Sequence, residues 1–282
     1  MYSEFEQFLS HALDEYPNGS VKEAALYSLM AGGKRVRPRL LFAALEAYHS
    51  DASKGYECGC AIEMMHTYSL IHDDLPSMDN DTLRRGKPTC HVKYGEANAI
   101  LAGDALLTHS FIHALKASIH SQQNLLIVRE VAQAGGLDGM IYGQEMDVEN
   151  KENRSLQDVY ELEKIHRYKT GKLIALPLVC AAILAGKNED IETWREIGYL
   201  IGLMFQIQDD VLDVTKTSEE LGKNAHSDWE NNKATYVTLL GEVGCRENIE
   251  KINATILERI STLNIDKEPI LKIVHYLVNR EN

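Results

Sequence analysis

Residues 66–86 of this chain, HTYSLIHDDLPSMDNDTLRRG, combine an apolar helical pattern with an unusual concentration of charge. Clustered carboxylates repel one another unless cations neutralise them. Oxygen-rich clusters suit magnesium, which shares its remaining positions with substrate phosphates, and arginines supply the paired donors that hold phosphate oxygens. The stretch therefore predicts a site for a divalent metal and an anionic substrate, built from Asp73, Asp74, Asp79, Asp81, Arg84 and Arg85.

The spacing of the aspartates predicts a break in this helix. In a straight α-helix, Asp79 would be turned roughly 240° from Asp73, so the two could not share a face. Pro76 lies between them and favours a helix end, which lets the backbone bring the later carboxylate back. A second acidic cluster, QIQDDVLD at residues 206–213, keeps helical spacing. We expect the two clusters to face one another across a cavity.

Apolar residues recur at three- and four-residue spacing along almost the whole chain, as in the series Leu200, Met204, Ile207 and Val211. Alternating patterns typical of strands are scarce. The pattern predicts an all-α protein of about ten or more helices. No stretch is long enough, or rich enough in Gly, Ser or Pro, to be a domain linker, so residues 1–282 are expected to form a single domain.

Composition narrows the classes of partner. The net charge of −13 leaves no basic excess to neutralise a nucleic-acid backbone, so nucleic acid is not expected to bind. The N-terminus lacks the basic start and apolar core of a signal peptide. The longest apolar run, residues 173–186, contains Pro177 and is too short to span a bilayer. Five cysteines without a recognisable pairing pattern suit a reducing compartment, and a cytoplasmic protein is expected.

Two plainer interpretations compete with the metal and phosphate site. The first acidic cluster could be a solvated turn rich in aspartate, although a mere turn has no need of the arginines beside it. His72 and Asp73 could instead form the dyad of a metal-dependent hydrolase. That dyad would need further metal-binding histidines, and His91, His109 and His113 offer no clear second ligand set.

Taken together, these motifs resemble those of the trans-type polyprenyl diphosphate synthases, and most closely those of the bacterial farnesyl diphosphate synthases. The first aspartate-rich motif of that family, in its form with two inserted residues, matches DDLPSMD at residues 73–79, and the second matches DDVLD at 209–213. Further family motifs follow in the expected order: GGKRVRP at 32–38, the segment at His66, RRG at 84–86, KTG at 169–171, and LGK at 221–223 with Asp228 and Lys233. The resemblance covers nearly the whole chain and implies an isoprenoid synthase fold around a central cavity.

The resemblance also implies a role for each matching residue. Magnesium would be held by the first-ranked ligands Asp73, Asp79 and Asp209, with Asp74, Asp210 and Asp213 in support. Isopentenyl diphosphate would be bound by Gly33, Lys34, Arg37, His66 and Arg85. The allylic diphosphate would contact Arg84, Lys169, Lys223 and Lys233, with Thr170 and Gln206 near the carbon centre where positive charge develops; Lys169, Thr170 and Gln206 form the expected catalytic set. Asn232 departs from the glycine that many relatives carry before Lys233.

The length of the product is expected to depend on residues just before the first aspartate motif. Tyr68 lies five residues before Asp73, about 7.5 Å lower along a helix, and Ser69 lies one turn before that acid. A bulky Tyr68 would block a lengthening tail, which favours the fifteen-carbon farnesyl product, although Tyr68 could also be an ordinary core aromatic. The alternatives are a geranylgeranyl or geranyl diphosphate synthase, or a non-catalytic subunit of a heteromeric synthase. The resemblance implies a homodimer.

Overall fold

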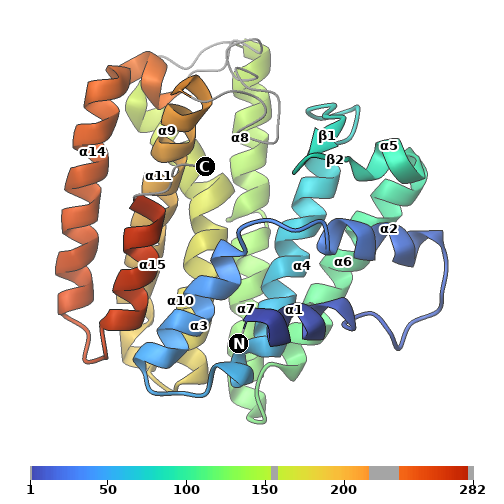
Figure 1. The fold of residues 1–282 in the computed structure, drawn as a ribbon, viewed down its shortest axis with the longest axis horizontal. Helices are drawn as coiled ribbons and strands as arrows, with labels where there is room; N and C mark the ends of the chain where they lie inside the picture. Colours follow the sequence, from blue (N-terminus) through green and yellow to red (C-terminus); the bar gives the residue numbers. More distant parts are fainter. Residues whose placement is uncertain (1, 154–157, 216–234, 279–282) are drawn as a thin grey trace.

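The structure, a computed structural model, describes residues 2–153, 158–215 and 235–278. Within these ranges almost all regular structure is helical, which confirms the all-α prediction of ten or more helices (Figure 1). The first half of the chain contributes α1 (Tyr2–Ser10), α2 (Ser20–Leu29), α3 (Val36–Ala47), η1 (Ala52–Gly55), α4 (Tyr56–Asp73), α5 (Cys90–Tyr94), α6 (Glu96–Lys116) and α7 (Ser121–Gly135). The second half contributes α8 (Met140–Asn153), α9 (Val159–His166), η2 (Arg167–Gly171), α10 (Lys172–Leu184), η3 (Asn188–Asp190), α11 (Ile191–Thr215), α14 (Tyr236–Ser261) and α15 (Glu268–Val278).

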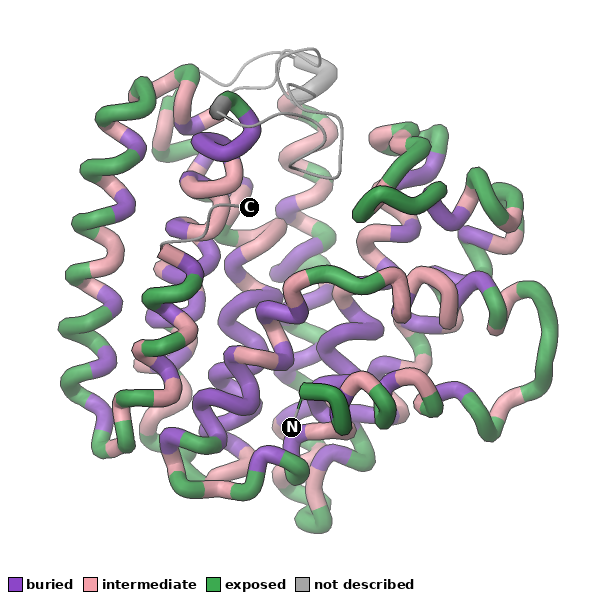
Figure 2. Tube along the Cα trace, in the orientation of Figure 1, coloured by how far each residue is buried: buried purple, intermediate pink, exposed green. Residues whose placement is uncertain are grey.

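The core lies where α3, α4 and α10 meet. Every residue of α10 from Leu173 to Ile183 is buried, as expected for a helix that is apolar on all sides. Helix α10 contacts α3, α4, α7 and α11, and α4 packs along α6. Figure 2 shows buried residues concentrated in these central helices, whereas the peripheral α14 alternates between buried and exposed positions. The apolar packing fixes the helices whose ends carry the charged motifs.

Helix α4 ends at Asp73, at the point where the sequence predicts a break. After the helix, the backbone N–H groups of Met78 and Asn80 donate to the Leu75 carbonyl, and that of Asp79 donates to the Asp73 carbonyl at 2.9 Å. The chain around Pro76 therefore turns back on the helix end. The predicted return of residue 79 to residue 73 is confirmed for the backbone.

A short hairpin follows this loop, a departure from the purely helical expectation. Strand β1 (Leu83–Arg84) pairs antiparallel with β2 (Lys87–Pro88) through the turn residues Arg85 and Gly86. Both turn residues have positive φ, 55° and 72°, as in the type I′ turns whose twist suits a two-residue hairpin. The Arg-Gly pair is a weak signal for such a turn because arginine seldom adopts positive φ.

Two further expectations concern the cysteines and the bilayer. All five cysteines are free and buried. Among the described residues, every helix falls short of the length and apolarity that a membrane crossing requires.

Candidate active site

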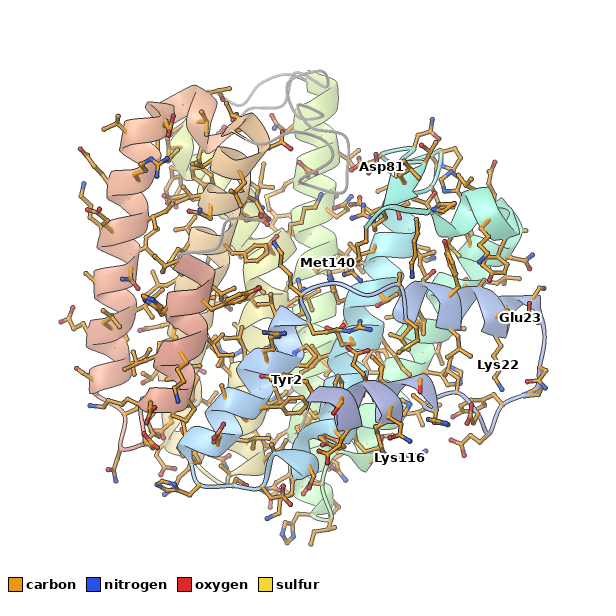
Figure 3. All side chains as sticks on the ribbon, in the orientation of Figure 1. Tyr2, Lys22, Glu23, Asp81, Lys116 and Met140 are labelled. Atoms are coloured by element: carbon orange, nitrogen blue, oxygen red, sulfur yellow. The ribbon has the colours of Figure 1, made fainter. Side chains whose placement is uncertain are left out.

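A cavity of about 640 Å³ opens beside the end of α4 and brings together many of the predicted site residues. Its charged and polar lining includes Asp73, Arg37, His66, Lys169 and Thr170. Its apolar lining includes Leu70, Leu107, Met140 and Leu173, and both predicted length-determining residues, Tyr68 and Ser69, lie on its wall. In Figure 3, Asp81 marks the hairpin end of the molecule and Met140 marks the start of α8 lower in the view. The cavity thus combines a charged region with an apolar wall.

Asp73 and Asp74 are neighbours in sequence but have different surroundings. Asp73 lines the cavity and accepts a hydrogen bond from the side-chain amide of Gln144 on α8. Asp74 is buried, and its carboxylate accepts from the guanidinium of Arg84 at 2.6–2.9 Å. Arg84 also lies 3.5 Å from Asp81. In the structure, the guanidinium of Arg84 therefore makes ion pairs with two carboxylates of the first acidic motif and the loop after it.

The predicted isopentenyl diphosphate residues converge from three segments. Arg37 from α3 and His66 from α4 line the cavity. The guanidinium of Arg85 lies against Gly33, where a side chain would collide with it, and donates to the Gly32 carbonyl. Burial lowers the pKa of Arg37 to about 10, an effect that Glu63 partly opposes and Arg85 reinforces. Burial, followed by the charges of Arg37 and Arg85, also lowers the pKa of His66 well below its usual value. The positive charge of the two arginines around His66 favours the binding of an anion.

Arg35 lies within the same basic segment but points into the protein. Its guanidinium donates to Glu63 at 2.6 Å, to Glu6 at 2.7 Å and to the Leu29 carbonyl at 2.8 Å. Arg35 is therefore part of the protein interior and not of a solvated basic surface. Its ion pair with buried Glu63 ties the loop before α3 to α4, and Lys34 is half-buried in that loop.

Lys169 and Thr170 lie on η2, a single π-helical turn between α9 and α10. Such turns are rare and recur at functional sites because the wider turn reorients side chains. Lys169 Nζ donates to Asp147 on α8 at 2.6 Å, and the Thr170 hydroxyl donates to the side-chain oxygen of Gln206 on α11 at 2.6 Å. The π-turn thereby links α8 to α11, and the structure brings the three predicted catalytic residues into one neighbourhood.

The second acidic cluster occupies the C-terminal part of α11. Asp209 is half-buried, Asp213 is buried, and Asp210 accepts a hydrogen bond at 2.7 Å from the backbone N–H of Tyr236 at the start of α14. A carboxylate at a helix N-terminus is favourable for that helix. Gln206 begins this cluster, one turn before its aspartates, so the contact between Thr170 and Gln206 connects the cluster to the π-turn. Lys223, Lys233 and Asn232 lie outside the described residues.

The described residues contain no group of three His, Cys, Asp or Glu side chains that could hold a metal ion. This finding gives no support to the hydrolase hypothesis, and His72 instead directs its Nε2 at the Ile100 carbonyl and lies 3.8 Å from Asp104. Magnesium is still compatible with the carboxylate oxygens present. It binds proteins through one or two carboxylates and takes its other ligands from water and phosphate, which suits Asp73 on the cavity wall.

Gln144 and Asp147 are site residues that the sequence analysis missed. They lie three positions apart on α8, so they share a helix face and contact Asp73 and Lys169 respectively. That spacing is the only signal available in the sequence, and polar pairs with this spacing are common on exposed helices. Their role becomes visible only once α8 is seen to pack against η2.

The comparisons with known proteins identify the family. The family model described as Polyprenyl synthetase matches residues 18–274. This chain belongs to that family. As a polyprenyl synthetase it is a prenyltransferase of isoprenoid biosynthesis, a class whose substrates are isoprenyl diphosphates, and its fold is the helical fold of solved relatives.

Relatives at similar identity carry different product names. The synthetase is 43% identical over 267 residues to a farnesyl diphosphate synthase of Bacillus subtilis, covering 93% of this chain and 90% of that one. It is 44% identical to the large subunit 1 of a chloroplastic heterodimeric geranylgeranyl pyrophosphate synthase of Arabidopsis thaliana, covering 93% and 72% of the two chains. A geranyltransferase of Helicobacter pylori, complexed with magnesium and isoprenyl diphosphate, superposes with a TM-score of 0.85 at 33% identity, covering 99% and 94%.

The close contact between α8 and η2 yields a first prediction. A Cβ atom at Gly143 would collide with the backbone of Tyr168 and Lys169, so Gly143→Ala should displace the π-turn. We expect a loss of about 1–3 kcal/mol in unfolding free energy, as for other overpacked positions, together with reduced turnover. Thermal unfolding and steady-state assays measure both effects. Gly19→Ala is the control, because a methyl group there meets no atom within 4 Å, and equal behaviour of the two variants would contradict the prediction.

Proposed function

We propose that this polyprenyl synthetase is a magnesium-dependent farnesyl diphosphate synthase that condenses isopentenyl diphosphate with dimethylallyl and then geranyl diphosphate. The observation that carries the proposal is that one cavity, of about 640 Å³, joins Asp73, Lys169 and Arg37 to an apolar wall containing Tyr68. A diphosphate needs the charged groups, and a growing hydrocarbon tail needs the apolar wall.

The two substrates would bind at different groups of residues. Isopentenyl diphosphate would bind at the convergent positive region, which the proposal assigns to Gly33, Lys34, Arg37, His66 and Arg85. The lowered pKa of His66 leaves its imidazole neutral near pH 7, so it would act as a hydrogen-bonding group until a bound diphosphate offsets the surrounding charge. The allylic diphosphate would lie toward Asp73 and Lys169, with Arg84, Lys223 and Lys233 as its further proposed cationic ligands.

Magnesium would be held between the acidic motifs. The proposed ligands are Asp73, Asp79 and Asp209, and Asp74, Asp210 and Asp213 support them. The hydrogen bonds from Arg84 to Asp74 and from the Tyr236 N–H to Asp210 suit supporting positions, since both carboxylates are already occupied. The bound metal would neutralise charge on the departing diphosphate.

The residues of the π-turn would stabilise the reaction. Loss of diphosphate from the allylic substrate leaves a carbocation, and the fixed charge of Lys169 would lower the barrier by stabilising the anion that leaves. The oxygens of Thr170 and Gln206, held together at 2.6 Å, would lie near the positive carbon. The double bond of isopentenyl diphosphate then forms the new carbon–carbon bond, and a proton leaves to the released diphosphate. Positioning of the two substrates contributes roughly 7 kcal/mol or more in favourable cases.

The proposal of a farnesyl product rests on Tyr68. Relatives at similar identity are named for farnesyl or geranylgeranyl products, so overall similarity does not discriminate between fifteen and twenty carbons. Tyr68 is 5% exposed and lies on the cavity wall one helical turn and a half before Asp73. Its ring would limit the depth available to the tail. A geranylgeranyl diphosphate synthase is the alternative.

Replacing Tyr68 should therefore lengthen the product. Tyr68→Ala is expected to shift the main product from fifteen to twenty or more carbons. Turnover should stay within about tenfold of the wild-type value, since the change enlarges the cavity without altering the charged groups. Chromatography of the dephosphorylated products measures the shift. Tyr56→Ala on the same helix is the control, because Tyr56 packs against Phe5, Phe8 and Phe42 away from the cavity. An unchanged product from Tyr68→Ala would remove this residue from the proposal.

The test of the function as a whole is an assay of the purified protein with isopentenyl and dimethylallyl diphosphates, with magnesium and with a chelator. Magnesium-dependent farnesyl diphosphate is expected. A dominant twenty-carbon or ten-carbon product would overturn the farnesyl assignment, and a folded protein that gains activity only with a second kind of subunit would favour the non-catalytic alternative. The proposal also includes a homodimer, which light scattering tests directly, a single domain over residues 1–282 and a cytoplasmic location.

A further inference from the structure

The ring of Tyr68 lacks a polar anchor of its own. The hydroxyl is buried and finds no hydrogen-bond partner within the described part of the chain, and burial raises its pKa to about 12. A buried tyrosine usually secures its position through a hydroxyl hydrogen bond. Packing contacts alone must therefore determine where this ring lies on the cavity wall.

His72 supplies an oriented contact to that ring. It lies one turn after Tyr68 on α4, and the two ring centroids are 5.8 Å apart with planes inclined at 83°. This edge-to-face arrangement is a favoured geometry for aromatic rings and stabilises the pair beyond the effect of burial. Both rings line the cavity, so loss of the His72 ring would release Tyr68 from its position on the wall.

Helix α6 in turn fixes His72. The His72 Nε2 atom lies 3.1 Å from the Ile100 carbonyl oxygen and 3.8 Å from Asp104. The ring sits directly over Gly103, where any Cβ atom would collide with it. Glycine at this position therefore creates the space that the imidazole occupies, and a backbone carbonyl holds the imidazole in that space.

We propose that His72 is a positioning residue for product length, which holds Tyr68 against the cavity wall by bracing its ring from α6. The inference rests on the proposed function, because it concerns the length of the prenyl product. It gives a role to His72, which lies directly before the first aspartate motif and which the proposed function assigns neither to metal nor to diphosphate. In this arrangement Gly103 and the Ile100 carbonyl, both on a different helix from Tyr68, contribute to product length through His72.

Two variants on different helices test the proposal. His72→Asn retains a polar group for the Ile100 carbonyl but lacks the ring, and Gly103→Ala expels the ring from its place. Both are expected to raise the share of products longer than the main wild-type product by about tenfold or more, the discrimination that a small change in pocket shape confers. His109→Ala is the matched control on α6, because His109 packs edge-on against Tyr16, outside the cavity lining. An unchanged product distribution in His72→Asn would overturn the proposal.

A double variant distinguishes positioning from simple widening. If His72 acts through Tyr68, then Tyr68→Ala with His72→Asn should give the same product distribution as Tyr68→Ala alone, because contacting residues are coupled and their effects do not add. Products longer than those of Tyr68→Ala would overturn the positioning role. The wild-type product reports on the farnesyl proposal, whereas the change between wild type and variant reports on His72. A wild-type enzyme whose main product has twenty carbons would thus refute the farnesyl proposal without refuting the role of His72.

Discussion

Asp73→Asn is expected to lower kcat by roughly 10²–10³-fold, the cost of removing one fixed electrostatic group from a reacting centre. Asp73 ends α4, lines the cavity and accepts a hydrogen bond from Gln144. The asparagine side chain has nearly the same shape, so the fold should persist. The loss removes the negative charge that would attract magnesium, and the magnesium concentration required for half-maximal activity should rise as well.

Steady-state assays over a magnesium titration measure both consequences. Asp104→Asn is the matched control, because Asp104 also lines the cavity but is exposed on α6. Its turnover and magnesium dependence should stay close to those of the wild type. If Asp73→Asn retained wild-type turnover, or if both variants lost turnover equally, Asp73 would not be the leading ligand.

Lys169→Met is expected to lower kcat by roughly 10²-fold or more, because the ammonium group would stabilise the departing diphosphate. The methionine side chain keeps much of the apolar stem of Lys169. It lacks the ammonium group, which donates a hydrogen bond to the Asp147 carboxylate at 2.6 Å. The Asp147 carboxylate then loses its ammonium partner although its side chain is only 16% exposed. Loss of a partner in such a pair also destabilises a protein, so a fall in unfolding temperature should accompany the loss of turnover.

A second substitution separates these two effects. Lys169→Met combined with Asp147→Asn should recover the unfolding temperature, because the carboxylate that lost its ammonium partner is neutral as well, but it should not recover kcat. Lys172→Met is the control, since Lys172 lies three residues further on. Its ammonium group contacts the rings of Tyr168 and Tyr199 and is not part of the lining of the 640 Å³ cavity. Recovery of turnover in the double variant would show that Lys169 acts only through the stability of the π-turn.

The helix class and the position of the first aspartate follow from local sequence. The three- and four-residue periodicity requires nothing beyond a helix with a buried face, and the break after Asp73 follows from Pro76 and the turn-forming residues around it. The acids and bases expected near the cavity also appear there, among them Arg37, His66 and Asp73. These features can be predicted from the sequence because the residues that produce them lie within a few positions of one another.

The tertiary structure decides which of these charged residues can face a ligand. Asp73 and Asp74 are adjacent and chemically identical, yet one reaches the cavity and the other is paired with Arg84. Asp210 is bound by the start of α14, and Arg35 is drawn inward by Glu63. The partners come from other helices and loops, and periodicity within one helix carries no information about them. Gln144 and the placement of His72 over Gly103 depend in the same way on helices that meet only in the folded chain, because packing against distant segments selects the side chains that remain available for chemistry.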